Sequence, residues 1–300
     1  MKSQLAVKVR IALPCLTSLT FSWTLDNLIY YDKEFGKHSV GLTLLQSATG
    51  YHYEESSMAA EGIPLESAKW NALSKENVSL LDEWNSGLIE KQLLSYMFRV
   101  NYDYNNKYLL TVSGRWDGAS QLAEGNKWAF FPSAALGWRL DQEEFLKDVT
   151  WLNQLKFRLG VGVTGNSAID PYQTKGAIVS LYYPFGSALA PGYAASEPLI
   201  KDGAVAMANK NLSWEKTTQY NIGLDYSVLN GRISGVLDFY TSRTTDLLMA
   251  MTIPSLNGYT NTYANVGKTS NIGVDITLNT VNVKTRDFEW STSINAAWQK

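Results

Sequence analysis

Strict alternation of apolar and polar residues is the most regular feature of the chain between residues 212 and 246. Apolar residues recur at every second position from 220 to 228, and again from 233 to 239. A period of two predicts β-strands with one apolar and one polar face. Asn230-Gly231 separates the two arms, and this dipeptide favours a tight hairpin because both turn positions take a positive φ. The pattern therefore predicts a long antiparallel hairpin.

The same alternation recurs along most of the chain and predicts about ten strands. Most of them have ten residues or more, whereas strands usually have about 5–6. The predicted strands cover residues 19–32, 39–53, 95–104, 108–117, 130–141, 155–164, 212–229, 232–246, 271–280 and 288–300. Residues 56–90, 165–211 and 247–262 are predicted as loops, the first with a helical middle, and residues 142–152 as about one helical turn.

The predicted connections differ in length. Those after residues 104, 141, 229 and 283 are short, whereas those after residues 53, 118, 165 and 246 are long. Outer-membrane β-barrels have this asymmetry, with short periplasmic turns and long extracellular loops. The predicted fold class is therefore all-β, with long antiparallel meander strands that form about ten strands of a larger transmembrane barrel.

Composition narrows the classes of function. Charged residues make up 18% of the 300 residues and the formal net charge is −2, whereas soluble domains have about 25% charged residues. A nucleic-acid binder would usually show a basic stripe. Cys15 is the single cysteine, and with His38 and His52 it does not match a zinc pattern. No apolar run approaches the roughly 20 residues of a transmembrane helix, so a membrane form of this chain would have to be a barrel.

The polar faces of the predicted strands carry charges of both signs. In a barrel these faces would line the lumen, while Trp116 and Trp138 on the apolar faces would meet lipid or its boundary. The candidate lumen-facing residues are Arg99, Arg115, Asp117, Arg158 and Asp225.

No motif predicts catalysis, a cofactor or a metal ion. Gly160, Gly162 and Gly165 spell a dinucleotide-binding pattern, but no helix is predicted after it. Small residues on a lumen face would instead leave room for a plug. Acid–base catalysis by Arg115 and Asp117 would need a second carboxylate, and no pattern places one beside them. No calcium-binding loop occurs in the sequence. We therefore expect a protein that is not an enzyme.

The longest predicted loop is rich in aromatic residues. Such rings would either stack on the sugar rings of a ligand or pack the loop against its neighbours. The candidate ligand contacts are Tyr182, Tyr183, Phe185 and Tyr193.

The first residues superficially suggest a signal peptide. Lys8 and Arg10 interrupt what would have to be an unbroken apolar segment. We therefore predict an irregular start over residues 1–16 and a partial barrel domain over residues 17–300.

From about residue 20 onward the chain resembles the barrel of the SusC/RagA family of TonB-dependent outer-membrane transporters. The similarity is spread over many short segments in a fixed order. They include Tyr31-Asp32-Lys33, Arg99-Val100-Asn101-Tyr102, Lys107–Thr111, Arg115–Gly118, Phe131-Pro132-Ser133, Gly137-Trp138, Thr164-Gly165-Asn166, Trp214–Thr217, Gly223-Leu224-Asp225, Thr245–Leu248, Asn265-Val266-Gly267 and Asn271-Ile272-Gly273.

This resemblance implies a plugged barrel of about 22 strands in a Gram-negative, Bacteroidetes-like outer membrane. It implies import of oligosaccharides or peptides driven by TonB through the plug, with a SusD-like surface lipoprotein as lid, outer-membrane lipid around the barrel and no nucleic acid. We expect the chain to be an inner fragment of such a barrel, without plug, TonB box or signal peptide. Two alternatives stay open, a passive porin or structural barrel and a soluble carbohydrate-binding β-protein.

Overall fold

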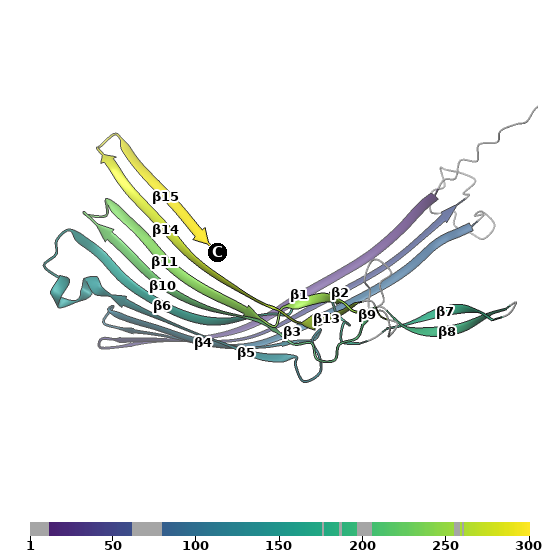
Figure 1. Cartoon of the computed structure of the whole chain (residues 1–300). Coiled ribbons are helices and arrows are strands. Elements are labelled where there is room, and N and C mark those ends of the chain that lie inside the picture. The colour runs from purple at the N-terminus through teal and green to yellow at the C-terminus, as the bar shows by residue number, and fades with distance from the viewer. Residues whose placement is uncertain are drawn as a thin grey trace, which may run out of the picture. The chain divides into compact units, whose positions relative to one another are not determined.

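The structure is a computed structural model that describes residues 12–61, 80–175, 177–185, 188–196, 206–254, 259 and 261–300. It confirms an all-β fold with one ten-stranded sheet, and the neighbours from β3 to β15 pair antiparallel (Figure 1). In sheet order the strands are β1 (Ala12–Phe35), β2 (His38–Glu61), β3 (Leu80–Tyr104), β4 (Tyr108–Ala119), β5 (Trp128–Arg139), β6 (Leu152–Asn166), β10 (Glu215–Val228), β11 (Ile233–Thr245), β14 (Lys268–Lys284) and β15 (Glu289–Gln299).

The chain divides into two compact units. The first comprises residues 1–24 and 49–92, and in it His52 contacts Glu54 (3.2 Å) and Glu90 (3.0 Å). The second comprises residues 25–48 and 93–300 and contains β4 and every later strand. All candidate site residues from the sequence belong to the second unit.

Two predicted loops were wrong in part. Strands β2 and β3 extend into the segment 56–90, and the expected helical stretch falls largely on residues 62–79, outside the described residues. The segment 165–211 contains a hairpin of β7 (Ala177–Phe185) and β8 (Ala188–Ser196). Neither strand shows a clear alternation of apolar and polar residues. The hairpin therefore forms by pairing of the two strands and has no local sequence signal.

The predicted loop 247–262 was also wrong in part. It contains β12 (Leu248–Thr252) and the start of β13 (Asn261–Asn265). Strand β13 pairs parallel with β9 (Ala206–Met207), which completes a small three-stranded sheet. Parallel pairing of segments so far apart in sequence leaves no signal in either segment alone.

The turn between β10 and β11 is wider than the expected two residues. Leu229, Asn230 and Gly231 all have positive φ, at 55°, 57° and 76°. The amide of Leu229 donates to the carbonyl of Trp151 (2.7 Å) and the amide of Gly231 to Oδ1 of Asn153 (3.1 Å). The four-residue loop 229–232 therefore contacts Trp151 and Asn153 around the start of β6.

The connections gather at two ends of the second unit's strands. We call the end with residues 36–37, 105–107, 140–151, 229–232 and 285–288 the turn end, and the end with 120–127, 167–214 and 246–267 the loop end. The expected alternation of lengths fails once, because the connection 120–127 is shorter than 140–151, which holds two short 3-10 helices (Leu140–Gln142 and Glu144–Leu146).

Strand register confirms one apolar and one polar face for the eight strands from β3 to β15 in the large sheet. One row of directly opposed residues on the apolar face crosses eight strands, and its members are Tyr102, Leu110, Leu136, Leu159, Ile222, Phe239, Val274 and Trp298. Large side chains on this face are exposed, for example Tyr220 (56%) and Ile222 (47%). No helix in the described part of the chain is long and apolar enough to cross a membrane.

The beginning of β1 overlaps the predicted irregular start. The strand begins at Ala12, and residues 1–11 lie outside the described residues. The boundary between residues 16 and 17 stays a prediction.

Candidate functional site

An ion-pair network crosses three strands on the polar face. Nε of Arg158 on β6 donates to both carboxylate oxygens of Asp225 on β10 (2.9 and 3.1 Å). Nη2 of Arg158 donates to Oδ1 of Asp238 on β11 (2.9 Å). The three side chains are a quarter to a third exposed. One arginine thus satisfies two carboxylates and ties β6 to β10 and β11.

Gly223 lies under this network. The register places it directly between Arg158 and Asp238. A Cβ at position 223 would lie 2.6 Å from Cζ of Arg158 and would also collide with the carboxylate of Asp238. The absence of a side chain therefore lets the guanidinium reach across β10.

A second ion pair lies on the same face nearer the loop end. Nε of Arg115 donates to Oδ1 of Asp117 (2.7 Å), and its Nη2 donates to the hydroxyl of Ser95 on β3 (2.9 Å). Ser95 and Asp117 are buried. Register places Arg99 opposite Ser113, on this face as well.

The five charged candidates therefore share one face but do not form one cluster. Arg158 with Asp225 and Arg115 with Asp117 make two separate ion pairs, and Arg99 joins neither. Whether this face lines a lumen stays a prediction. Sequence reasoning placed Asp238 on the polar face but left it out of the candidates, because strand register alone shows that it shares Arg158.

A hollow of about 610 Å³ lies beside the first network. Gly160 and Gly162 form part of its lining, and a Cβ on Gly160 would meet one atom, Cβ of Asn221 at 3.9 Å. Lys156 and Gln219 also line it. The expectation that these glycines leave open space on the polar face agrees with this geometry, whereas its use by a plug stays a prediction.

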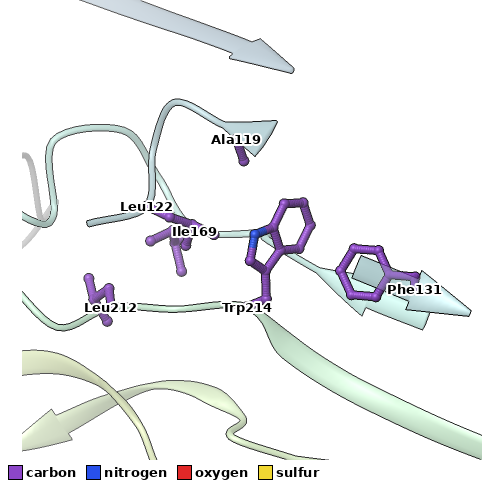
Figure 2. Close-up of a cluster of buried hydrophobic side chains, with 6 residues drawn as sticks. All are labelled: Ala119, Leu122, Phe131, Ile169, Leu212 and Trp214. Carbon is purple, nitrogen blue, oxygen red and sulfur yellow. The ribbon is translucent and has the colours of Figure 1, made fainter. Parts of the chain in front are cut away.

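A cluster of buried apolar side chains packs connections of the loop end against one another and against the strands (Figure 2). The Trp214 ring contacts Phe131 edge to face at 5.2 Å and is 5% exposed. Its Nε1 donates to the carbonyl of Lys127 (2.8 Å). The members come from β4, β5 and the connections 120–127 and 167–214, and they are Ala119, Leu122, Phe131, Ile169, Leu212 and Trp214.

Polar contacts extend this cluster to the small sheet. The amide of Ser213 donates to Oδ1 of Asn265, and Nδ2 of Asn265 donates to the carbonyl of Ser213, both at 2.8 Å. The amide of Leu248 donates to Oε2 of Glu215 (3.1 Å). We call the buried cluster with these contacts the loop platform, which joins connections that are far apart in sequence.

A carboxylate anchors the turn end. Glu143 accepts hydrogen bonds from the Tyr108 hydroxyl (2.8 Å), Nε1 of Trp138 (3.1 Å) and Nζ of Lys107 (3.3 Å). These donors, the Tyr108 hydroxyl first, hold the pKa of Glu143 below its ordinary value. Trp138 thus lies at the turn end of the apolar face, and Trp116 lies near the loop end, 54% exposed.

The four loop aromatics lie on the β7–β8 hairpin. Tyr182, Tyr183 and Phe185 belong to β7, and Tyr193 to β8, opposite Ser180. Ligand contact by these residues stays a prediction. Among the described residues, no three His, Cys, Asp or Glu side chains gather as a metal-ion site.

Comparison with known proteins agrees with this architecture. Residues 16–300 match the family model described as TonB dependent receptor-like, beta-barrel. The chain is 39% identical over 240 residues to the TonB-dependent receptor SusC of Bacteroides thetaiotaomicron, covering 76% of this chain and 22% of SusC. It is 34% identical over 279 residues to TonB-dependent receptor P26 of Formosa agariphila, covering 92% of this chain and 27% of that protein.

The solved structure of the RagAB peptide transporter is similar in fold. The TM-score is 0.81 at 24% sequence identity, with 97% of this chain and 30% of that chain covered. The chain thus spans about a quarter of the length of the curated relatives that it matches.

Proposed function

Because the chain belongs to the TonB dependent receptor-like β-barrel family, we propose that it forms part of the barrel wall of a SusC-like nutrient importer in a Gram-negative outer membrane. The observation that carries this proposal is the two-faced sheet. One face exposes a continuous row of apolar side chains, whereas the other carries the Arg158 and Arg115 ion pairs. A wall between lipid and an aqueous passage requires these two surfaces.

The substrate class we propose is an oligosaccharide or a peptide. The matched relatives are named TonB-dependent receptors, and the solved RagAB structure is titled a peptide transporter. The RagAB title supports the peptide alternative, and the resemblance to the SusC/RagA family supports both alternatives. We assign no catalytic step to the chain.

The proposed mechanism belongs to the assembled importer. The connections of the loop end and a SusD-like lipoprotein capture the solute, TonB moves a plug domain, and the solute crosses the lumen along the polar face. The β7–β8 hairpin supplies Tyr182, Tyr183, Phe185 and Tyr193 to the capture step. The loop platform supports capture by holding Leu212 and Trp214 against β4 and β5.

The test is uptake by the full-length importer in its own cells. Replacement of residues 177–196 by a short Gly-Ser linker should lower uptake of the growth-supporting oligosaccharide or peptide at least tenfold at limiting concentration. The matched control replaces Trp151, which is 57% exposed at the turn end, by Ala and should leave uptake unchanged.

Deletion of TonB separates this function from a passive pore. Uptake should stop in the deletion strain, because active import needs energy transmitted to the plug. Uptake that continues without TonB would support a passive porin and contradict the proposal.

A further inference from the structure

Three basic side chains lie together on the apolar face at the loop end. Lys216 on β10 and Lys268 on β14 flank Thr245 of β11 in one row, and Arg243 lies two residues before Thr245 on the same face. Neighbouring strands are about 4.8 Å apart and alternate residues about 7 Å apart. The register therefore places the three Cα atoms within roughly 10 Å of one another. We call Lys216, Arg243 and Lys268 the basic triad.

The triad is available for a ligand. All three side chains are exposed, and no ion pair or hydrogen bond joins any of them to another described residue. The two nearest carboxylates along the chain differ in position. Glu215 points to the opposite face and accepts the amide of Leu248, whereas Asp246 lies beside the triad and accepts the hydroxyl of Thr245, which leaves the three cations in excess over one carboxylate.

Hydroxyl groups complete an anion-binding surface. Thr218 and Ser270 lie directly on either side of Arg243 in its row. Phosphate oxygens in proteins are bound by the ammonium group of Lys, the guanidinium group of Arg and the hydroxyl groups of Ser and Thr. Three cations within about 10 Å match an anion with two phosphates better than one with a single phosphate.

The rows next to the triad are apolar. Tyr220 and Ile272 occupy the next row toward the turn end, and Ile222 and Phe239 the row after it. All four are large and exposed. A soluble phosphate would use only the triad, whereas a lipid would also place its acyl chains against these rows. Cations at the edge of an apolar band are expected where lipid headgroups begin.

We propose that the basic triad binds the headgroup of a lipid that carries two phosphates, in the leaflet at the loop end, with the acyl chains against Tyr220, Ile222 and Phe239. The placement of the apolar face in lipid rests on the proposed function. The lipid fills a site that lies outside the barrel, on the opposite side of the sheet from the ion-pair networks.

The test measures binding of a bisphosphorylated glucosamine lipid to the full-length protein in detergent micelles, by native mass spectrometry. The triple variant Lys216→Gln, Arg243→Gln, Lys268→Gln should bind roughly a hundredfold more weakly, because each basic residue near an anionic lipid surface strengthens binding about fivefold. The matched control, Lys147→Gln, Lys284→Gln, Arg286→Gln, removes three cations from the turn end and should bind within about twofold of the original protein.

Further variants separate charge from folding. Lys216→Arg with Lys268→Arg keeps both charges and should retain binding, and the dephosphorylated lipid should bind the original protein as weakly as the triple variant binds the phosphorylated one. Equal binding by the triple variant and the original protein would overturn the proposal. Displacement of the lipid by millimolar inorganic phosphate would also overturn it, since free phosphate would then be the ligand. Import plays no part in this readout, so loss of transport would leave it unchanged.

Discussion

At the scale of single residues, the glycines of the strands have opposite roles that their sequence context does not distinguish. Gly223 lies beneath a guanidinium and a carboxylate, whereas Gly160 faces open space in the hollow. Both occur in the same kind of alternating strand. The difference arises because register sets a long charged neighbour beside one glycine and a short one beside the other.

Replacement of Gly223 by Ala should destabilise the protein. The new methyl group would collide with Arg158 and Asp238 and force the ion pairs apart, which should cost about 1–3 kcal/mol. The measurement is the free energy of unfolding of the full-length protein in detergent, by guanidinium titration.

Gly160→Ala is the matched control, on the neighbouring strand and the same face. Its methyl group meets open space, so the free energy of unfolding should stay the same or rise slightly through the lower entropy of the unfolded chain. If Gly160→Ala lowered the free energy of unfolding as much as Gly223→Ala, then any alanine in these strands would be destabilising, and the collision with Arg158 would not be the cause.

At the scale of elements, the loop platform turns several connections into one packed unit. Leu212 and Trp214 precede β10, and they bury against Leu122 from the connection 120–127 and against Ile169 from the far end of their own connection. The sequence shows Leu212 and Trp214 only as the start of an alternating arm. Their partners could not be found from spacing, because they lie in loops with no periodic pattern.

Replacement of Trp214 by Ala should release these connections. The loss of a buried indole and of its hydrogen bond to Lys127 should cost about 3–5 kcal/mol locally. Limited proteolysis of the folded protein should then cut within residues 120–127 and 206–214 at least tenfold faster. Trp151→Ala, which removes an exposed indole, should leave the cleavage pattern unchanged, and the same pattern for both variants would contradict the role of the platform.

At the scale of the whole molecule, the chemistry of each face of the sheet indicates what that face contacts. The apolar row through Leu159, Ile222 and Phe239 is continuous only because pairing holds from β3 to β15 without a slip at these positions. A one-residue slip between two strands would move charged residues onto the apolar face. Register therefore protects the lipid-facing surface that we propose.

A charge on the apolar face should therefore prevent stable insertion. Ile222→Arg should cost about 2–4 kcal/mol in a bilayer, whereas Asn221→Arg, one residue away on the polar face, should be nearly neutral. The measurement is the fraction of full-length protein that folds into liposomes, seen as heat-modifiable migration on a gel. Equal losses for the two variants would contradict the assignment of the faces.

The sequence alone located the ten strands of the large sheet and determined the two faces from β3 to β15, since alternation is a local consequence of the pleat, but it missed the strands within the segments 165–211 and 247–262. It located the turn at Asn230-Gly231 and put Arg158, Asp225 and Asp238 on one face. Tertiary structure decided what strand pairing controls: that Arg158 reaches both aspartates over Gly223, that Trp214 packs with distant loops, and that β9 joins β13. Such contacts join residues tens of positions apart, and a local pattern holds no information about which distant segment will lie beside it.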